Sequence, residues 1–142
     1  MKGKKFLIKI GVVVLLVVMV GGTIVSIKEK KESENAIHIV QSGVSKINEN
    51  SNYKEAFEKY FTNLSWFTYK NSQGIRVVGF TAQRYMHDRN TMGDYEISYI
   101  VDENTNTFKF YKGTCNGIEL NQLDMLKITI SAFSQVDSVN NY

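Results

Sequence analysis

The chain of 142 residues contains no proline, one cysteine, one tryptophan and two histidines. A single cysteine, Cys115, excludes an internal disulfide framework and a zinc site built from cysteines. The histidines, His38 and His87, belong to no H-x-x-x-H or H-E-x-x-H motif, so a transition-metal site is not expected. The phosphate-binding loop motif and the G-x-S-x-G nucleophile motif are also absent. These absences predict a protein without a cofactor and favour a non-enzymatic function.

A net positive charge is confined to the first 31 positions. The net charge is +3, yet residues 1–31 contain seven lysines and one glutamate, whereas residues 32–142 contain ten basic and thirteen acidic side chains. The first segment therefore carries a charge of +6 and the second a charge of −3. Because the basic excess borders an apolar segment, it does not indicate nucleic acid as a partner.

An uncharged run of 18 mostly apolar residues extends from Ile10 to Ile27. A helix of about 20 apolar residues spans the hydrocarbon core of a bilayer, so the run predicts a transmembrane helix whose partner is the lipid bilayer. Four lysines precede the run and three follow it. This distribution favours a cytoplasmic N-terminus and a C-terminal domain outside the cell membrane, in a single-pass topology.

Two other interpretations of this run stay open. A charged start and an apolar centre are also typical of a secretory signal peptide, and Val20 and Gly22 could form a cleavage pair that releases a secreted domain. The run could also be a buried helix of a soluble fold. Because it lacks an A-x-A pattern and stays apolar up to Ile27, an uncleaved anchor is the preferred interpretation.

Charge and hydropathy divide the chain into five parts. These are a cytoplasmic basic start (1–9), the transmembrane helix (10–27), a charged linker (28–35), an extracytoplasmic α+β domain (36–134) and a polar tail (135–142). The tail, from Ser134, is expected to fray.

Three segments of the domain have the spacing of amphipathic helices. The first combines Ile37, Val40, Val44 and Ile47 on one face, and a polar turn is expected at 48–52. The second has Ser51 or Asn52 as a candidate N-cap, and its apolar face comprises Tyr53, Ala56, Phe57, Tyr60, Phe61 and Leu64. The third has Asn121 as a candidate cap, and its apolar face comprises Leu120, Leu123, Leu126, Ile130 and Phe133.

Between the second and third helices the hydrophobic period changes from 3.6 to 2, which predicts four strands. They cover 65–70, 75–84, 95–101 and a segment that starts at 108 and is broken by Asn116-Gly117, and 85–93 is expected to be a polar connection. Val78, Phe80 and Ala82 share one face of the second strand. Short connections favour an antiparallel meander. The element order therefore predicts a two-layer α+β domain of helices packed on a four-stranded antiparallel sheet, with a C-terminal helix.

Four short motifs run through this domain: Tyr53-Lys54-Glu55-Ala56-Phe57-Glu58-Lys59-Tyr60-Phe61, Leu64-Ser65-Trp66, Val77-Val78-Gly79-Phe80-Thr81 and Asn116-Gly117-Ile118-Glu119. They resemble the G-x-A-F-x-x-F-F, P-x-W, V-V-E-F-T-G and N-x-V-x-Q signatures of an uncharacterised family of small proteins from Gram-positive bacteria. Members carry an N-terminal membrane helix, in some cases preceded by a zinc-ribbon, and a short α+β domain. This chain has Leu64, Gly79 and Ala82 where proline, glutamate and glycine are common in the family. The resemblance implies an architecture and a membrane location, and no chemistry.

Arg84, Tyr85, His87 and Arg89 form a compact cluster of basic and aromatic residues in the sequence of the domain. Such a cluster can contact an anionic surface, such as a wall polymer, and an ordinary exposed loop is the alternative. His87 precedes Asp88, but sequence neighbours rarely take the geometry of a catalytic base and its carboxylate. Further candidates for a partner surface on the free face of the sheet are Arg76, Thr81 and Lys109.

The sequence therefore favours a non-enzymatic, membrane-anchored extracytoplasmic binding or assembly module. Its expected partner is another envelope protein or a peptide. One alternative is a scaffold component of a conjugation or secretion system with a nuclear-transport-factor-like fold, which rests on analogy of fold. The other is an enzyme with an unrecognised site, which would require a polar pocket with converging ionisable groups.

Overall fold

The computed structural model describes residues 28–139. The chain divides into two compact units, Met1–Glu34 and Asn35–Tyr142. In the first unit residues 28–34 are helical, and Lys28 Nζ lies 4.0 Å from Glu32 Oε1. The predicted transmembrane helix, residues 10–27, lies outside the described residues. Within residues 28–139 no helix has the length and apolarity needed to span a bilayer.

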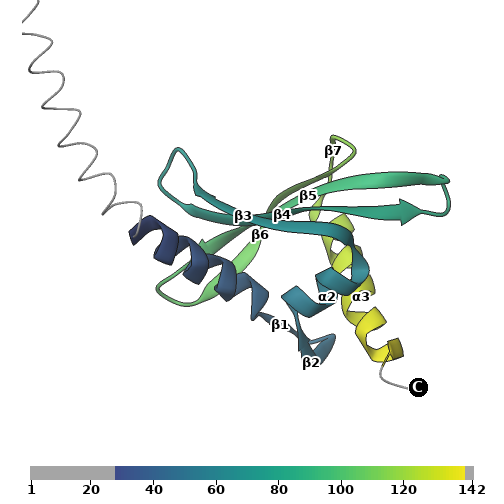
Figure 1. Cartoon of the computed structure of the whole chain (residues 1–142), viewed down its shortest axis with the longest axis horizontal. Coiled ribbons are helices and arrows are strands. Elements are labelled where there is room, and N and C mark those ends of the chain that lie inside the picture. The colour runs from purple at the N-terminus through teal and green to yellow at the C-terminus, as the bar shows by residue number, and fades with distance from the viewer. Residues whose placement is uncertain (1–27, 140–142) are drawn as a thin grey trace, which may run out of the picture. The chain divides into compact units, whose positions relative to one another are not determined.

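The second unit is built on a twisted antiparallel sheet (Figure 1). In the described chain this sheet has five strands, which are neighbours in chain order: β3 (Thr62–Lys70), β4 (Arg76–Met86), β5 (Thr91–Asp102), β6 (Thr107–Cys115) and β7 (Ile118–Glu119). The predicted meander is confirmed, but the prediction of four strands is wrong. Asn116 and Gly117 adopt positive φ angles of 51° and 78°, which turns the chain back so that Ile118 pairs with Cys115.

Strands β4 and β5 are longer than predicted. They pair as far as Met86 and Thr91, so most of the predicted connection over 85–93 is strand. A tight turn at 87–90 suffices because Asn90 takes a left-handed backbone conformation with φ 50°. The paired strands therefore extend well beyond the apolar residues by which a strand is recognised in sequence.

The first helix was predicted to reach Ile47, but it ends sooner. Residues 28–41 are helical, and the chain then turns at Ser42 and Gly43. A Cβ atom on Gly43 would lie 2.5 Å from the Phe108 ring, so the turn packs against β6 in a way that glycine permits. After the turn, β1 (Val44–Ser45) and β2 (Asn48–Asn52) form a separate two-stranded sheet in place of the predicted polar turn. Val44 and Ile47 are consequently 56% and 41% exposed instead of lying on a buried helical face.

Helix α2 (Tyr53–Tyr60) begins where the sequence predicts. The Asn52 Oδ1 atom accepts a hydrogen bond of 2.8 Å from the backbone N–H of Glu55, so Asn52 is the N-cap of the two predicted candidates. The helix ends before Phe61, and Leu64, predicted on its apolar face, lies in β3 instead. Asn63, with φ 51°, lies near the start of β3, where the register with β4 shifts between Thr62 and Ser65.

Helix α3 (Gln122–Val139) is capped by Asn121, as predicted. Asn121 Oδ1 accepts a 2.8 Å hydrogen bond from the N–H of Asp124, and Asp124 Oδ2 accepts one of 3.0 Å from the N–H of Asn121. The helix continues to Val139, so residues 134–139 of the predicted tail are helical, and residues 140–142 of it lie outside the described residues.

The apolar face predicted for α3 is also wrong in large part. Met125, Ala132 and Phe133 are buried, whereas Leu123, Leu126 and Ile130 are 57%, 53% and 43% exposed. The helix carries two overlapping apolar stripes, and both have helical spacing. Only packing against the rest of the domain selects the one that is buried.

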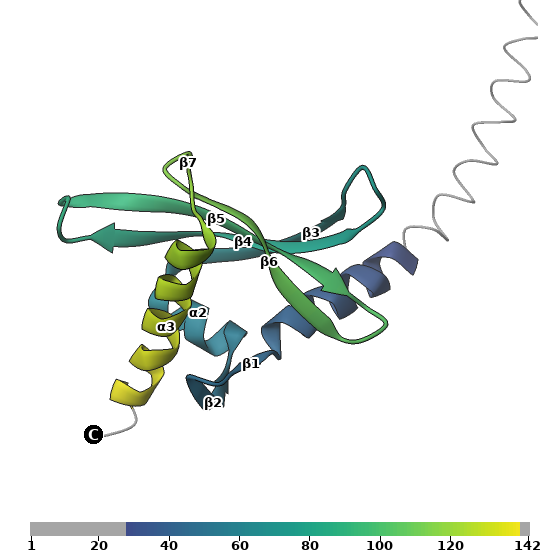
Figure 2. The ribbon, with the colours of Figure 1, turned by 180° about the vertical axis from the view of Figure 1, so that it is seen from behind.

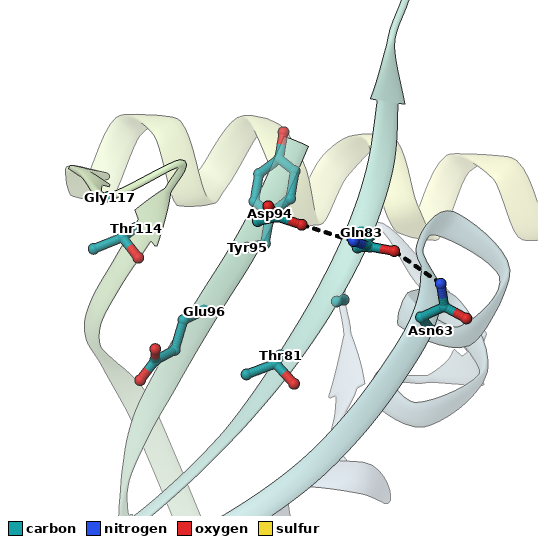
Figure 3. Close-up of a pocket in the computed structure, with 9 residues that line it drawn as sticks. Asn63, Thr81, Gln83, Asp94, Tyr95, Glu96, Thr114 and Gly117 are labelled. Carbon is teal, nitrogen blue, oxygen red and sulfur yellow. Dashed lines mark hydrogen bonds between the residues drawn. The ribbon is translucent and has the colours of Figure 1, made fainter. Parts of the chain in front are cut away.

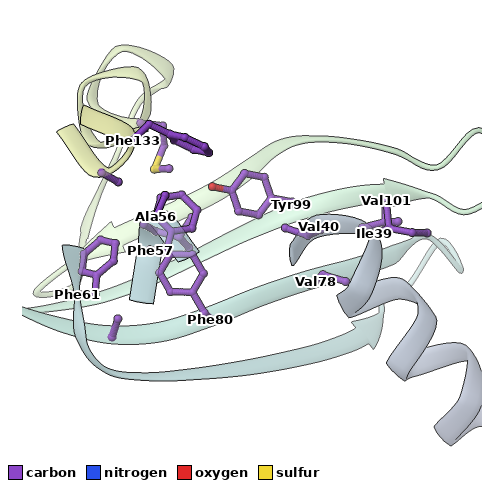
Figure 4. Packing of buried hydrophobic residues seen from close by; sticks show 14 of the residues in the cluster. Ile39, Val40, Ala56, Phe57, Phe61, Val78, Phe80, Tyr99, Val101 and Phe133 are labelled. Carbon is purple, nitrogen blue, oxygen red and sulfur yellow. The ribbon is translucent and has the colours of Figure 1, made fainter. Parts of the chain in front are cut away.

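Helices α2 and α3 lie on the same side of the sheet in both views (Figures 1 and 2). Residues from α2, α3, the helix that ends at residue 41 and the covered sheet face form one core (Figure 4). The predicted triplet of Val78, Phe80 and Ala82 is buried in it. Its aromatic centre is the ring of Tyr53, which meets the rings of Phe57, Tyr99, Phe108 and Phe133 edge-on at centroid distances of 5.0–6.1 Å. The predicted two-layer α+β architecture is thereby confirmed.

Candidate binding surfaces

The second face of the sheet carries ordered rows of polar side chains. Strand register places Thr81 between Ser65 and Glu96, and Glu96 beside Thr114. Because side chains alternate along a strand, these residues all project from the face opposite the core. The row therefore crosses four neighbouring strands on this open face.

A second row is held by hydrogen bonds between side chains (Figure 3). Asn63 Nδ2 donates to Gln83 Oε1 at 2.8 Å, and Gln83 Nε2 donates to Asp94 Oδ1 at 2.8 Å. The backbone of Asp94 is fixed in turn by Asn116, whose Oδ1 accepts from the Asp94 N–H at 2.8 Å. This chain of contacts orients the Asp94 carboxylate on the sheet.

The two rows border a shallow recess of about 590 Å³, which we call the polar recess. Asp94 and Glu96 contribute negative charge to its lining, and none of the described residues that line it is a lysine or an arginine. Thr81, a candidate from the sequence, lies here. The recess has the chemistry to accept hydrogen bonds from a cationic or hydroxyl-rich group.

A second recess, the apolar groove, lies between α3, β6 and the β1–β2 hairpin and has a volume of about 390 Å³. Its lining residues are mostly apolar or aromatic and come from five elements and the turn between β1 and β2: Ser45, Ile47, Tyr53, Tyr99, Phe108, Lys109, Phe110, Gln122, Met125, Leu126 and Thr129. Among these side chains, Lys109 alone carries a full charge at neutral pH. Lys109 was a candidate from the sequence, whereas Ile47 and Leu126 were expected to be buried on helical faces.

Tyr99, one of the residues that line the groove, carries a buried hydroxyl without a partner among the described residues. The Tyr99 side chain is 4% exposed. Burial, reinforced by the neighbouring Tyr53, raises the pKa of Tyr99 well above its ordinary value. The hydroxyl therefore stays protonated and can donate a hydrogen bond.

A third recess of about 540 Å³ lies beside β7 and the start of α3. Tyr95 and Cys115 both line it, and Cys115 is half-buried. Burial, followed by the hydrogen bond with the Cys115 side chain, raises the pKa of Tyr95 to about 12. Charged groups of both signs surround this recess, so it has no clear charge preference.

The structure separates the basic and aromatic cluster predicted from the sequence. Tyr85 and His87 lie together at the β4–β5 turn, with their rings edge-on at 4.9 Å, and the Tyr85 hydroxyl hydrogen bonds with Asn90 Oδ1. Arg89 is exposed at the same turn, where its Nε lies 3.9 Å from Asp88 Oδ2. These contacts leave Tyr85, His87 and Arg89 on one exposed turn.

Arg84 points away from this turn. Its guanidinium lies 3.5 Å from the centroid of the Tyr60 ring, and Nη1 donates a 2.6 Å hydrogen bond to the Tyr60 carbonyl. Strand alternation explains the separation, since Arg84 and Tyr85 face opposite sides of β4. Arg76 is also withdrawn from the surface: it is 8% exposed, and its Nε lies 4.0 Å from Glu103 Oε1.

Within residues 28–139 no three histidine, cysteine, aspartate or glutamate side chains gather closely enough to hold a metal ion. The fold and surfaces define a small α+β domain with a polar recess on its open sheet face and an apolar groove beside its helices. Comparisons with protein-family models, curated proteins and solved structures find no match.

Proposed function

We propose that this protein is a non-enzymatic, single-pass membrane protein whose C-terminal domain lies outside the membrane and binds a partner in the cell envelope. The observation that carries the binding role is the apolar groove, which is lined in part by Ile47 and Leu126, and these side chains are 41% and 53% exposed. Covering apolar surface contributes about 25 cal/mol per Å². A partner that covers this rim would therefore gain free energy.

The proposed location rests on the lysine-flanked apolar run of residues 10–27. A bilayer anchor of this type restricts the domain to the membrane surface, where it can hold or assemble other envelope proteins. The resemblance to the family of membrane-anchored α+β proteins from Gram-positive bacteria belongs to the same proposal and agrees with it in architecture.

Photo-crosslinking in the native cells tests the binding role. A photoreactive amino acid replaces Leu126 in the full chain, and the matched control carries it in place of the exposed Lys59 on α2, outside the groove. We expect a discrete adduct with one envelope protein from position 126 and not from position 59. The additional substitution Ile47→Asp, at the rim of the groove, should abolish the adduct.

The far-ultraviolet circular dichroism of each variant establishes that the domain remains folded. An identical pattern of adducts at both positions, or an adduct at position 126 that is unaffected by Ile47→Asp in a folded chain, would refute a partner site in the groove.

A further inference from the structure

Strand β6 has an outer edge that is open along most of its length. Its pairing with β7 involves Thr114 and Cys115. The Leu120 N–H also donates a 2.8 Å hydrogen bond to the Gly113 carbonyl, and over 107–112 no strand of the described chain pairs with this edge. An open edge presents backbone N–H and C=O groups on which an extended peptide can add as a further strand.

The apolar groove runs beside this same edge, because Phe108, Lys109 and Phe110 of β6 line it. Phe108 and Phe110 project toward the helices and pack against the core, close to Tyr53 and Leu126. A groove of about 390 Å³ has room for apolar side chains of an added strand.

The other side of the edge is basic. Lys109 is the register partner of Ile100, and Lys112 is the partner of Ser98, so both project from the open face. Both lysines are exposed. A strand beside β6 would thus meet an apolar groove on one side and two ammonium groups on the other.

We propose that the β6 edge binds an extended peptide segment of a partner protein in which apolar and acidic residues alternate. The inference deepens the proposed function and rests on it. Side chains of a strand alternate between its faces, so every second residue of the bound segment enters the apolar groove and the intervening residues face Lys109 and Lys112. Backbone hydrogen bonds to β6 supply affinity, and this alternation supplies specificity.

The buried Tyr99 hydroxyl is an independent observation in support of an occupant. Tyr99 lines the groove, and within residues 28–139 its buried hydroxyl has no hydrogen-bond partner. Buried polar groups without a partner are rare in folded proteins, and each carries a desolvation cost. A carbonyl of the bound segment can accept this hydrogen bond.

The test uses the purified full chain in detergent micelles and two fluorescent ten-residue peptides, one alternating valine with glutamate and the other alternating valine with lysine. Fluorescence anisotropy measures the dissociation constants. We expect the glutamate peptide to bind at least about tenfold more tightly, and N-methylation of alternate backbone nitrogens along the edge-facing side to abolish its binding.

The exposed lysines provide a matched pair of variants. Lys109→Glu should reverse the preference between the two peptides, whereas Lys59→Glu, the same charge change on α2, should leave it unchanged. Tyr99→Phe should weaken binding of the glutamate peptide without altering the charge preference.

Equal affinity for the two peptides, or a preference that Lys109→Glu does not change, would overturn the inference. If the adduct at position 126 persists in that case, the groove still binds a partner and the alternating peptide is the wrong occupant. If that adduct is also missing, the proposed function fails as well.

Discussion

At the scale of single residues, Gly79 shows how closely the sheet is packed. A Cβ atom at this position would lie 2.7 Å from the carbonyl oxygen of Ile97 and 2.6 Å from the Phe67 ring. A backbone atom cannot move aside as a flexible side chain can. Phe67 therefore occupies space that the absence of a side chain on Gly79 leaves open.

We expect Gly79→Ala to lower the free energy of unfolding by about 1–3 kcal/mol, because the added methyl group overpacks the strand pair. Urea denaturation of the purified full chain measures this change. Thr81→Ala is the control, since Thr81 is exposed on the same face of the same strand. Similar small losses for both variants would show that the sheet adapts to the methyl group.

Removal of the Tyr99 hydroxyl, unlike the Gly79→Ala substitution, is not expected to lower the free energy of unfolding. Because it is buried and unpaired, Tyr99→Phe should leave the free energy of unfolding unchanged or raise it slightly. Phe57→Ala, which removes a fully buried ring from the same core, should lower it by about 3–5 kcal/mol. A large loss for Tyr99→Phe in urea denaturation would mean that the hydroxyl has a partner in the folded protein.

At the scale of elements, asparagine forms the helix caps and many of the bends, positions where serine and proline are often found. Asn52 and Asn121 cap α2 and α3, and Asn63, Asn90, Asn106 and Asn116 adopt positive φ angles at bends. Asparagine tolerates the left-handed region and bonds to nearby backbone groups, so a chain without proline can still turn sharply.

Asn52→Ala should lower the free energy of unfolding by about 1 kcal/mol, since the N–H of Glu55 loses its acceptor. Asn52→Asp should retain most of the stability because a carboxylate also caps a helix. Thermal unfolding followed by circular dichroism compares both with Lys54→Ala, an exposed change in the same helix. Equal melting temperatures for Asn52→Ala and Lys54→Ala would contradict a stabilising cap.

Helices α2 and α3 were predictable from apolar spacing and caps, but the buried face of α3 was not. Leu123, Leu126 and Ile130 have the spacing of a core stripe, as do Met125 and Ala132 with Ile128. The first stripe is exposed because the helix presents the second to the core. The apolar groove was not predicted either, because two of its rim residues, Ile47 and Leu126, were expected to be buried.

At the scale of the whole molecule, its buried tyrosines predict sensitivity to alkali. The pKa values of Tyr53, Tyr95 and Tyr99 are raised in the folded state, chiefly by burial, and that of Tyr95 reaches about 12. Unfolded tyrosine has a pKa of about 10. Above that pH the unfolded chain releases protons that the folded chain retains, so the free energy of unfolding falls as pH rises.

We therefore expect stability to be independent of these tyrosines below pH 10 and to decline between about pH 10 and 12. Urea denaturation at a series of pH values measures the decline. Tyr99→Phe should make it less steep, whereas Tyr69→Phe, at a more exposed site, is the control. If the free energy of unfolding falls equally steeply with pH in the unmodified protein, Tyr99→Phe and Tyr69→Phe, other groups dominate alkaline unfolding.

Membrane topology is tested by cysteine labelling in intact cells, in a Cys115→Ser background. Thr105→Cys places a thiol in the exposed β5–β6 turn, and Lys4→Cys places one before the apolar run. A membrane-impermeant maleimide should label position 105 in intact cells and position 4 only after lysis. The opposite pattern would reverse the proposed orientation, and a labelled domain in the medium would indicate cleavage of the anchor.

The sequence by itself determined the class of fold, the antiparallel meander, the starts of α2 and α3 and the lysine-bordered apolar run, because these depend on local spacing, caps and composition. The tertiary structure alone decided which stripe of α3 is buried, where the 28–41 helix stops and which face of β4 receives Arg84. Those outcomes follow from contacts between distant residues, such as Gly43 against Phe108 and Arg84 over Tyr60. The apolar groove is of the same kind, since five elements meet in it and no stretch of sequence contains them all.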